Sequence, residues 1–289
     1  MVELTESPIG YDYVAISLTQ SRINKGLLAI PVSLIENFPR EKTKVHVFFD
    51  DTDFPIERNF TPYESSSWEC RIGGMREFYA KKNIKGGDEI VIQFLGENHY
   101  RILSEKKFKS LVNKYQNEFD ASENEHKAEE KIKALAIITN TDEKTVTTSE
   151  FLRLSKKTIE PRRYRGQRTA RGKEIVPYSL RQLLAEVYKG KCQLTDFTFL
   201  MKNGKPYFEI HHIRADSGHH LKNLLVVSPN VHAQFEYSIV DERFDGEGWL
   251  RRVRFNEQEF AVKQFIDNLK IKFSKEVHLL NEPTHMLKK

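Results

Sequence analysis

Residues 207–213 read Tyr-Phe-Glu-Ile-His-His-Ile, and residues 221–237 read Leu-Lys-Asn-Leu-Leu-Val-Val-Ser-Pro-Asn-Val-His-Ala-Gln-Phe-Glu-Tyr. Each stretch contains a short apolar run, and a polar turn that includes Gly218 separates the two runs, so the pattern predicts a β-hairpin. Pro229 suits the first turn of a helix, where its missing N–H is not needed. The sequence therefore predicts two antiparallel strands followed by a helix.

Histidines from both parts of this arrangement are expected to converge. Alternation along a strand puts Glu209 and His211 on one face and His212 on the other. His232 falls near the start of the expected helix, and Glu236 follows one turn later on the same face. Hydrolysis of a phosphodiester needs a divalent cation at the phosphate and a base with a pKa of about 7 that activates water. Adjacent histidines suit both needs, because one can bind metal while the other faces the water.

The order His-His-Ile, Asn-Leu-Leu-Val-Val and Ser-Pro-Asn-Val-His-Ala-Gln-Phe-Glu resembles the HNH nucleases, which have the ββα-metal fold, over residues 192–237. The resemblance implies that His211 and His232 are metal ligands and that His212 is the general base. It also implies that Asn223 braces the hairpin and orients the base. Each role is carried over by position in the motif.

The same resemblance bears on the metals. Glu236 stands where many members have an acidic residue or a histidine, so it is a candidate further ligand. The expected cation is Mg²⁺, with Mn²⁺, Ni²⁺ or Co²⁺ as alternatives because imidazoles suit softer ions. Many members also hold a structural zinc between two Cys-x-x-Cys pairs. Here only Cys192 of those four thiolates remains, so we expect no structural zinc and a hairpin held by packing. His219 and His220, in the turn, are expected at the surface or on phosphates.

The N-terminal part has a different pattern, with many short strands and little helix, which favours a closed or nearly closed barrel. Strands are expected at residues 13–18, 26–30, 44–49, 68–72 and 89–94, and helices at residues 31–37 and 75–83.

Residues 18–31, Leu-Thr-Gln-Ser-Arg-Ile-Asn-Lys-Gly-Leu-Leu-Ala-Ile-Pro, resemble the opening of plant B3-type DNA-binding domains, and residues 74–94 resemble their closing helix, Gly-Asp turn and last strand. The resemblance implies a β-pseudobarrel with two arms that grip the major groove of DNA. Arg and Lys suit guanine or phosphate, and Asn and Gln suit adenine. The implied DNA contacts are Gln20, Ser21, Arg22, Asn24 and Lys25 in the first arm, and Arg58, Asn59, Thr61 and Tyr63 in the second. The alternative interpretation is that these are ordinary polar loops.

A strongly basic run lies between the two regions of resemblance. Residues 151–175 contain nine Lys or Arg against Glu160 and Glu174, a surplus that exceeds the +5 of the whole chain. Beside a nuclease motif, such a run is expected to contact phosphates without regard to sequence. The contacts expected from it are Arg162, Arg163, Arg165 and Arg168.

The sequence thus predicts an α+β protein of two domains. Residues 1–103 are expected to form the B3-like pseudobarrel, and residues 151–289, with the core at 192–237, the HNH nuclease domain with flanking helices. Residues 104–150, rich in Lys, Glu, Asn and Gln, are expected to be a helical and polar linker. An amphipathic helix is expected at residues 178–188.

The composition of the chain indicates the cellular compartment in which the protein is expected. Among 289 residues only two are cysteines, Cys70 and Cys192, which fits a reducing cytosol. No apolar run approaches the roughly 18 residues that a membrane span requires. The N-terminus lacks the basic and apolar regions of a signal peptide. We therefore expect a cytoplasmic protein of a prokaryote, with no membrane partner.

The combined resemblance implies a type II restriction endonuclease that cuts double-stranded DNA with one cation per site. One HNH site cuts one strand, so a homodimer is expected. Three alternatives stay open: a modification-dependent enzyme, a homing or nicking nuclease, and a DNA-binding regulator with an inactive nuclease fold. The first would need an aromatic pocket for a flipped base, and Phe60, Tyr63 and Trp68 are candidates for it.

Overall fold

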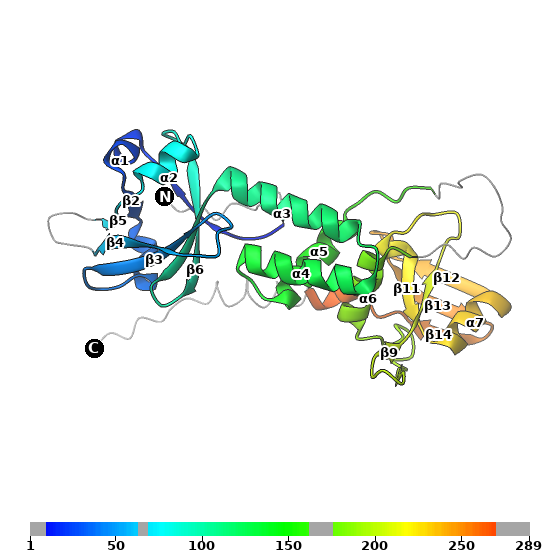
Figure 1. The fold of residues 1–289 in the computed structure, drawn as a ribbon. Helices are drawn as coiled ribbons and strands as arrows, with labels where there is room; N and C mark the ends of the chain where they lie inside the picture. Colours follow the sequence, from blue (N-terminus) through cyan, green and yellow to red (C-terminus); the bar gives the residue numbers. More distant parts are fainter. Residues whose placement is uncertain (1–9, 63–68, 162–175, 270–289) are drawn as a thin grey trace, which may run out of the picture. The chain divides into compact units, whose positions relative to one another are not determined.

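The computed structural model describes residues 10–62, 69–161 and 176–269 (Figure 1). The chain divides into two compact units. The first contains residues 1–122 and 126–149, and the second contains residues 123–125 and 150–289. Each unit has a sheet and helices of its own.

One mixed sheet of seven strands organises the first unit. The strands are β1 (Val14–Ser17), β2 (Leu28–Ile30), β3 (Thr43–Phe49), β4 (Ile56–Thr61), β5 (Cys70–Ile72), β6 (Glu89–Gly96) and β7 (His99–Ser104). Their order is β1-β6-β7-β3-β4-β5-β2, with β3 and β7 parallel and the other neighbours antiparallel. All seven strands contribute buried side chains to a single apolar core, so the sheet wraps around that core as a nearly closed barrel.

Aromatic and β-branched side chains fill this barrel. In β3 the side chains of Val45, Val47 and Phe49 are buried while those between them are less so, which is the period of two that a one-sided strand requires. The ring of Phe38 stacks between Tyr100 and Phe60, with centroid distances of 4.6 Å and 5.5 Å. Burial of each such ring stabilises the unit by about 2 kcal/mol.

Helices complete the first unit. They are α1 (Gln20–Lys25), the 3₁₀ helix η1 (Val32–Asn37), α2 (Arg76–Lys81), α3 (Glu105–Asp120), α4 (Glu125–Thr139) and α5 (Glu143–Ser155), of which α4 and α5 extend into the second unit. The hydroxyl of Ser104 caps α3 by accepting a hydrogen bond from the backbone N–H of Lys107. Near its end α4 is tied to β6, because Gln93 donates from Nε2 to the carbonyl of Ile138 at 2.5 Å.

The segment expected to be a helical and polar linker, residues 104–150, therefore consists of α3, α4 and most of α5. Ala128, Ile132 and Leu135 recur at helical spacing and are buried, although charged residues surround them in the sequence. Most of this segment belongs to the first unit, and α3 packs against β6 and β7 of its sheet.

The second unit contains the strand, strand and helix expected around the histidines. Its elements are α6 (Tyr178–Tyr188), β8 (Phe199–Leu200), β9 (Pro206–Tyr207), β10 (Glu209–His212), the 3₁₀ helix η2 (Leu221–Asn223), β11 (Leu224–Val227), α7 (Pro229–Tyr237), β12 (Val240–Phe244), β13 (Leu250–Phe255) and β14 (Gln258–Ala261). β10 pairs with β11 in an antiparallel hairpin, and β12, β13 and β14 form a separate antiparallel sheet.

An apolar core holds the hairpin of the second unit. Leu225 and Val227 from β11 pack with Val253 and Phe255 from β13, and Cys192 is buried in the same cluster. The chain after α7 thus supports the hairpin mainly through strands. β14 follows β13 in the same sheet, and a helix begins at residue 265.

None of the helices in the described ranges is both long enough and apolar enough to cross a lipid bilayer.

Candidate active site

The junction of β10, β11 and α7 places the candidate catalytic histidines. In the hairpin register His211 lies opposite Leu225, and His212 lies opposite Leu224. The hydroxyl of Ser228 caps α7 by accepting from the N–H of Val231, and proline occupies the first turn. These local features fix where α7 begins, and hence set His232 in its first turn beside β10.

His211 and His232 converge as the sequence predicted. Their ring centroids are 5.4 Å apart, and the ring of His211 stacks on Phe235 of α7 at 3.9 Å. Burial, with smaller contributions from the nearby His232 and His212, lowers the pKa of His211 to about 4. The imidazole of His211 is therefore neutral at neutral pH, which is the form that binds metals.

Glu209 joins these two histidines. Its Oε2 contacts Nδ1 of His232, and its Oε1 accepts a hydrogen bond of 2.9 Å from the hydroxyl of Tyr207. A carboxylate on one ring nitrogen orients a histidine so that the other nitrogen serves as a ligand. Sequence alternation places Glu209 on the face of His211, so its position was predictable, but a role in orienting His232 was not proposed from the sequence.

This donor set fits a divalent cation held by two imidazoles. Within the ranges that the structure describes, no three His, Cys, Asp or Glu side chains are placed to hold a metal ion together. Glu236 is exposed on α7 and does not complete such a group. His211 and His232 would then be the protein ligands, with water and phosphate oxygens in the remaining positions of an open catalytic site.

His212 lies on the other side of β10 and contacts a second histidine. Its Nε2 is 3.0 Å from Nδ1 of His219, and both rings are partly buried. His219 was expected at the surface or on a phosphate, and the structure places it against the candidate base instead. A contact between residues seven apart depends on how the turn folds, which strand periodicity does not reveal.

His220 is buried, so the expectation that it lies at the surface is wrong. Only 5% of its surface is exposed. Its Nδ1 accepts a hydrogen bond from the N–H of Lys222, and its Nε2 therefore carries the proton and donates to the carbonyl of Lys157 at 2.7 Å. This ring anchors the turn between β10 and β11 to Lys157, in the first part of the basic run.

Asn223 braces the same turn. Its Oδ1 accepts from the N–H of Arg214 at 2.8 Å, and its Nδ2 donates to the carbonyls of Arg214, Ser217 and Gly218 at 3.1 Å, 3.3 Å and 3.2 Å. The side chain is almost fully buried. One amide thus fixes the conformation of the turn that carries His219.

In the first unit, the residues expected to grip DNA lie on two elements. Residues 20–25 form α1, and Arg58, Asn59 and Thr61 lie on β4. Arg22 of α1 forms an ion pair with Glu69, the residue before β5. In α1, the side chain of Gln20 is already engaged, because it accepts from the N–H of Gly86 at 3.1 Å and donates to Asn24 at 2.9 Å.

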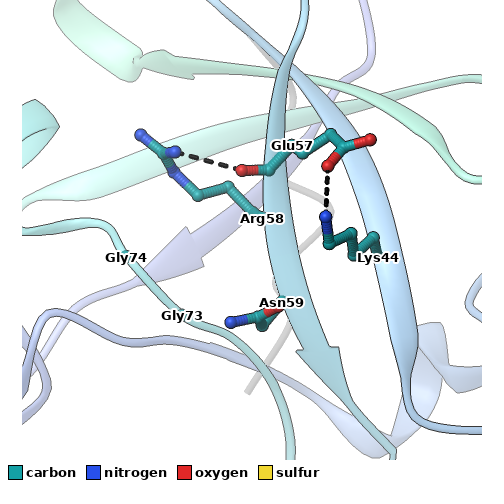
Figure 2. A pocket seen from close by; sticks show the side chains of 6 residues that line it. All are labelled: Lys44, Glu57, Arg58, Asn59, Gly73 and Gly74. Atoms are coloured by element: carbon teal, nitrogen blue, oxygen red, sulfur yellow. Dashed lines mark hydrogen bonds and ion pairs between the residues drawn. The ribbon is translucent and has the colours of Figure 1, made fainter.

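A polar hollow of about 210 Å³ lies beside Arg58 (Figure 2). Its lining residues are Lys44, Glu57, Arg58, Asn59, Gly73 and Gly74. Lys44 pairs with Glu57 at 2.6 Å, and the guanidinium of Arg58 lies 5.4 Å from the centre of the Phe49 ring. A side chain in place of Gly74 would meet Arg58 at 3.0 Å, so the glycine leaves room for this arginine. The hollow presents hydrogen-bonding groups at the surface of the second expected arm.

Five of the expected DNA contacts, and two of the three candidates for a base pocket, lie outside the described residues. The contacts are Tyr63, Arg162, Arg163, Arg165 and Arg168, and the pocket candidates are Tyr63 and Trp68. Phe60 is fully buried in the core of the barrel and stacks on Phe38. The suggestion that Phe60 lines a pocket for a flipped base is therefore wrong, because exposing it would open the core.

No protein-family model matches the chain, and a search of curated proteins found no match. Among solved structures, the chain is similar to one titled "Arabidopsis FUS3-DNA complex", with 17% sequence identity and a TM-score of 0.27. The match covers 31% of this chain and 92% of that chain. A TM-score this low does not establish a shared fold, so the fold of the first unit is defined by its own strands.

Proposed function

We propose that the protein is a metal-dependent DNA endonuclease of the HNH type. The observation that carries the proposal is the convergence of His211 and His232 where β10 meets α7. The carboxylate of Glu209 contacts His232, and His212 lies on the opposite face of β10. The hairpin and α7 together thus present a pair of imidazoles for a cation, and the hairpin presents a separate imidazole for proton transfer.

The proposed reaction assigns a task to each side chain. His212 takes a proton from a water molecule, and the water oxygen forms a bond to phosphorus while the bond from phosphorus to the 3′ oxygen breaks. The products are a 5′ phosphate and a 3′ hydroxyl, which takes up a proton from solvent. His211 and His232 would hold the cation, Mg²⁺ in the first instance. The chemistry that a bound divalent ion supplies is neutralisation of phosphate charge and stabilisation of the departing oxygen.

Nicking of supercoiled plasmid DNA tests this proposal. Wild-type protein is expected to nick plasmid with Mg²⁺ or Mn²⁺ but not with EDTA, and His212→Ala is expected to be slower by about 100-fold or more, because general base catalysis contributes on that scale. The matched control is His126→Ala, since His126 is an exposed histidine on α4. Equal nicking by wild type and His212→Ala would contradict the proposal and favour a DNA-binding regulator with an inactive nuclease fold.

We further propose that the substrate is double-stranded DNA and that the protein acts as a type II restriction enzyme, as a homodimer. This rests on the resemblance of residues 18–31 and 74–94 to B3-type domains and on the arm residues gathered on α1 and β4. The polar hollow at Arg58 and Asn59 offers donors and acceptors of the kinds that read base edges.

A further inference from the structure

The turn between β10 and β11 holds the ring of His219 against His212. The two nitrogens that meet are Nε2 of His212 and Nδ1 of His219, 3.0 Å apart, which is an ordinary hydrogen-bond distance. The centroids of the two rings are 5.1 Å apart and the planes are inclined by 58°, so the contact is made edge to edge through these nitrogens and is not a stack.

The direction of this hydrogen bond decides whether His212 can act as a base. If the Nδ1–H of His219 donated the hydrogen bond to Nε2 of His212, the neutral ring of His212 would carry its proton on Nδ1. That nitrogen could then not accept a proton from water. If His212 donates from Nε2 instead, its Nδ1 carries the lone pair. Only the second arrangement lets His212 take a proton from water while it stays bonded to His219.

We propose that His219 is the positioning residue of His212: its Nδ1 accepts a hydrogen bond from the Nε2–H of His212 and so selects the tautomer with a basic Nδ1. The inference deepens the nuclease proposal and rests on it for its catalytic meaning. The imidazolium that forms when His212 takes a proton keeps the same hydrogen bond, which becomes stronger because its donor is then charged.

The surroundings of His219 fit a positioning role, because both ends of its turn segment are fixed. On one side Gly218 donates its N–H to the carbonyl of Glu160 at 2.8 Å, and its own carbonyl accepts from Asn223. On the other side the buried ring of His220 bonds Lys157 and Lys222. A Cβ on residue 218 would lie 2.9 Å from the carbonyl oxygen of Glu160, so the close approach requires glycine.

Three substitutions at this position separate a positioning role from a structural one. His219→Ala removes the acceptor, His219→Asn places an amide oxygen near the position of Nδ1, and His219→Gln places it about one bond further out. We expect kcat for nicking to fall by about 10–100-fold in His219→Ala and His219→Gln, with KM changed less than about 2-fold. His219→Asn is expected to retain kcat within about 5-fold. The control is His99→Ala, because His99 belongs to the first unit, where its ring stacks on His46.

A readout without catalysis tests the hydrogen bond itself. Long-range ¹H–¹⁵N spectra of the metal-free full-length protein, at mildly alkaline pH, identify which nitrogen of His212 is protonated. We expect Nε2–H in wild type and in His219→Asn, and a mixture of tautomers in His219→Ala. A wild-type His212 protonated on Nδ1, or equal kcat in all three variants, would overturn the proposal. If wild type does not nick DNA, the nuclease proposal fails, and the tautomer measurement still decides whether His219 accepts from His212.

Discussion

The ring of His211 is buried against Phe235. Its protonation is therefore expected to change the free energy of unfolding, which can be measured as a function of pH. Its pKa is lowered to about 4, so between that pH and about 6.5 the unfolded chain binds a proton that the folded protein does not. The contribution of the neutral ring to the free energy of unfolding is therefore complete above the pKa that His211 has in the unfolded chain. It is lost as the pH falls through this window. It declines no further below the pKa that His211 has in the folded protein.

We predict that His211→Asn is less sensitive to acid than wild type. From neutral pH to about pH 4, the wild-type free energy of unfolding should fall by up to about 3 kcal/mol more than that of the variant. Urea unfolding in EDTA measures this, and His126→Asn, which changes an exposed histidine, should behave as wild type does. Parallel pH profiles for wild type and His211→Asn would show that the ring is not buried in its neutral form.

At the scale of residues, the strand period predicted the positions of His211, His212 and Glu209 from sequence alone. The hydrogen-bond partners were harder to predict. Asn223 closes the turn that brings His219 to His212, and the buried ring of His220 donates a hydrogen bond to the carbonyl of Lys157, which is distant in sequence. Contacts of this kind depend on three-dimensional closure of the turn, which leaves no periodic trace in the sequence.

The turn between β10 and β11 positions His219 against the candidate base, His212. Asn223 holds this turn, because its side-chain amide both accepts and donates hydrogen bonds to the backbone there. We predict that Asn223→Ala lowers the free energy of unfolding by about 2–3 kcal/mol, because buried backbone groups lose their partners. Asn223→Asp should cost more, because a carboxylate would face the carbonyls of Arg214, Ser217 and Gly218.

Urea unfolding of both Asn223 variants measures the effect, with His126→Ala as the control outside this turn. Equal stability of wild type and Asn223→Ala would show that water replaces the amide without loss. If Asn223→Asp has the same free energy of unfolding as Asn223→Ala, the three carbonyls do not face the side chain.

At the scale of elements, the strands of the first unit that the sequence did not predict are β4 and β7. β4 reads Ile-Glu-Arg-Asn-Phe-Thr, and only Phe60 among these residues is fully buried. β7 carries His99 and Arg101 among its apolar residues. Both strands lie inside the sheet order, where hydrogen bonds to neighbours on either side hold them despite polar side chains on the outer face. Pairing of this kind is set by tertiary structure and not by composition.

At the scale of the whole molecule, the chain combines a nearly closed sheet with a hairpin-and-helix unit that carries the histidines. The apolar pattern was sufficient to predict an α+β fold with a barrel-like N-terminal part. The sequence did not reveal that the helices at 104–150 bury an apolar face. Charged residues there outnumber the few apolar residues, such as Ile132 and Leu135, that α4 buries. In the proposed function, the first unit recognises DNA and the second unit cleaves it.

One measurement tests this division of tasks most directly: digestion of a plasmid, prepared unmethylated and fully methylated, by wild type and His212→Ala with Mg²⁺ or Mn²⁺. The account predicts discrete fragments from unmethylated DNA with wild type and none with His212→Ala. Fragments only from methylated DNA would place the protein among modification-dependent enzymes. The absence of metal-dependent cutting of either DNA by wild type would contradict the account.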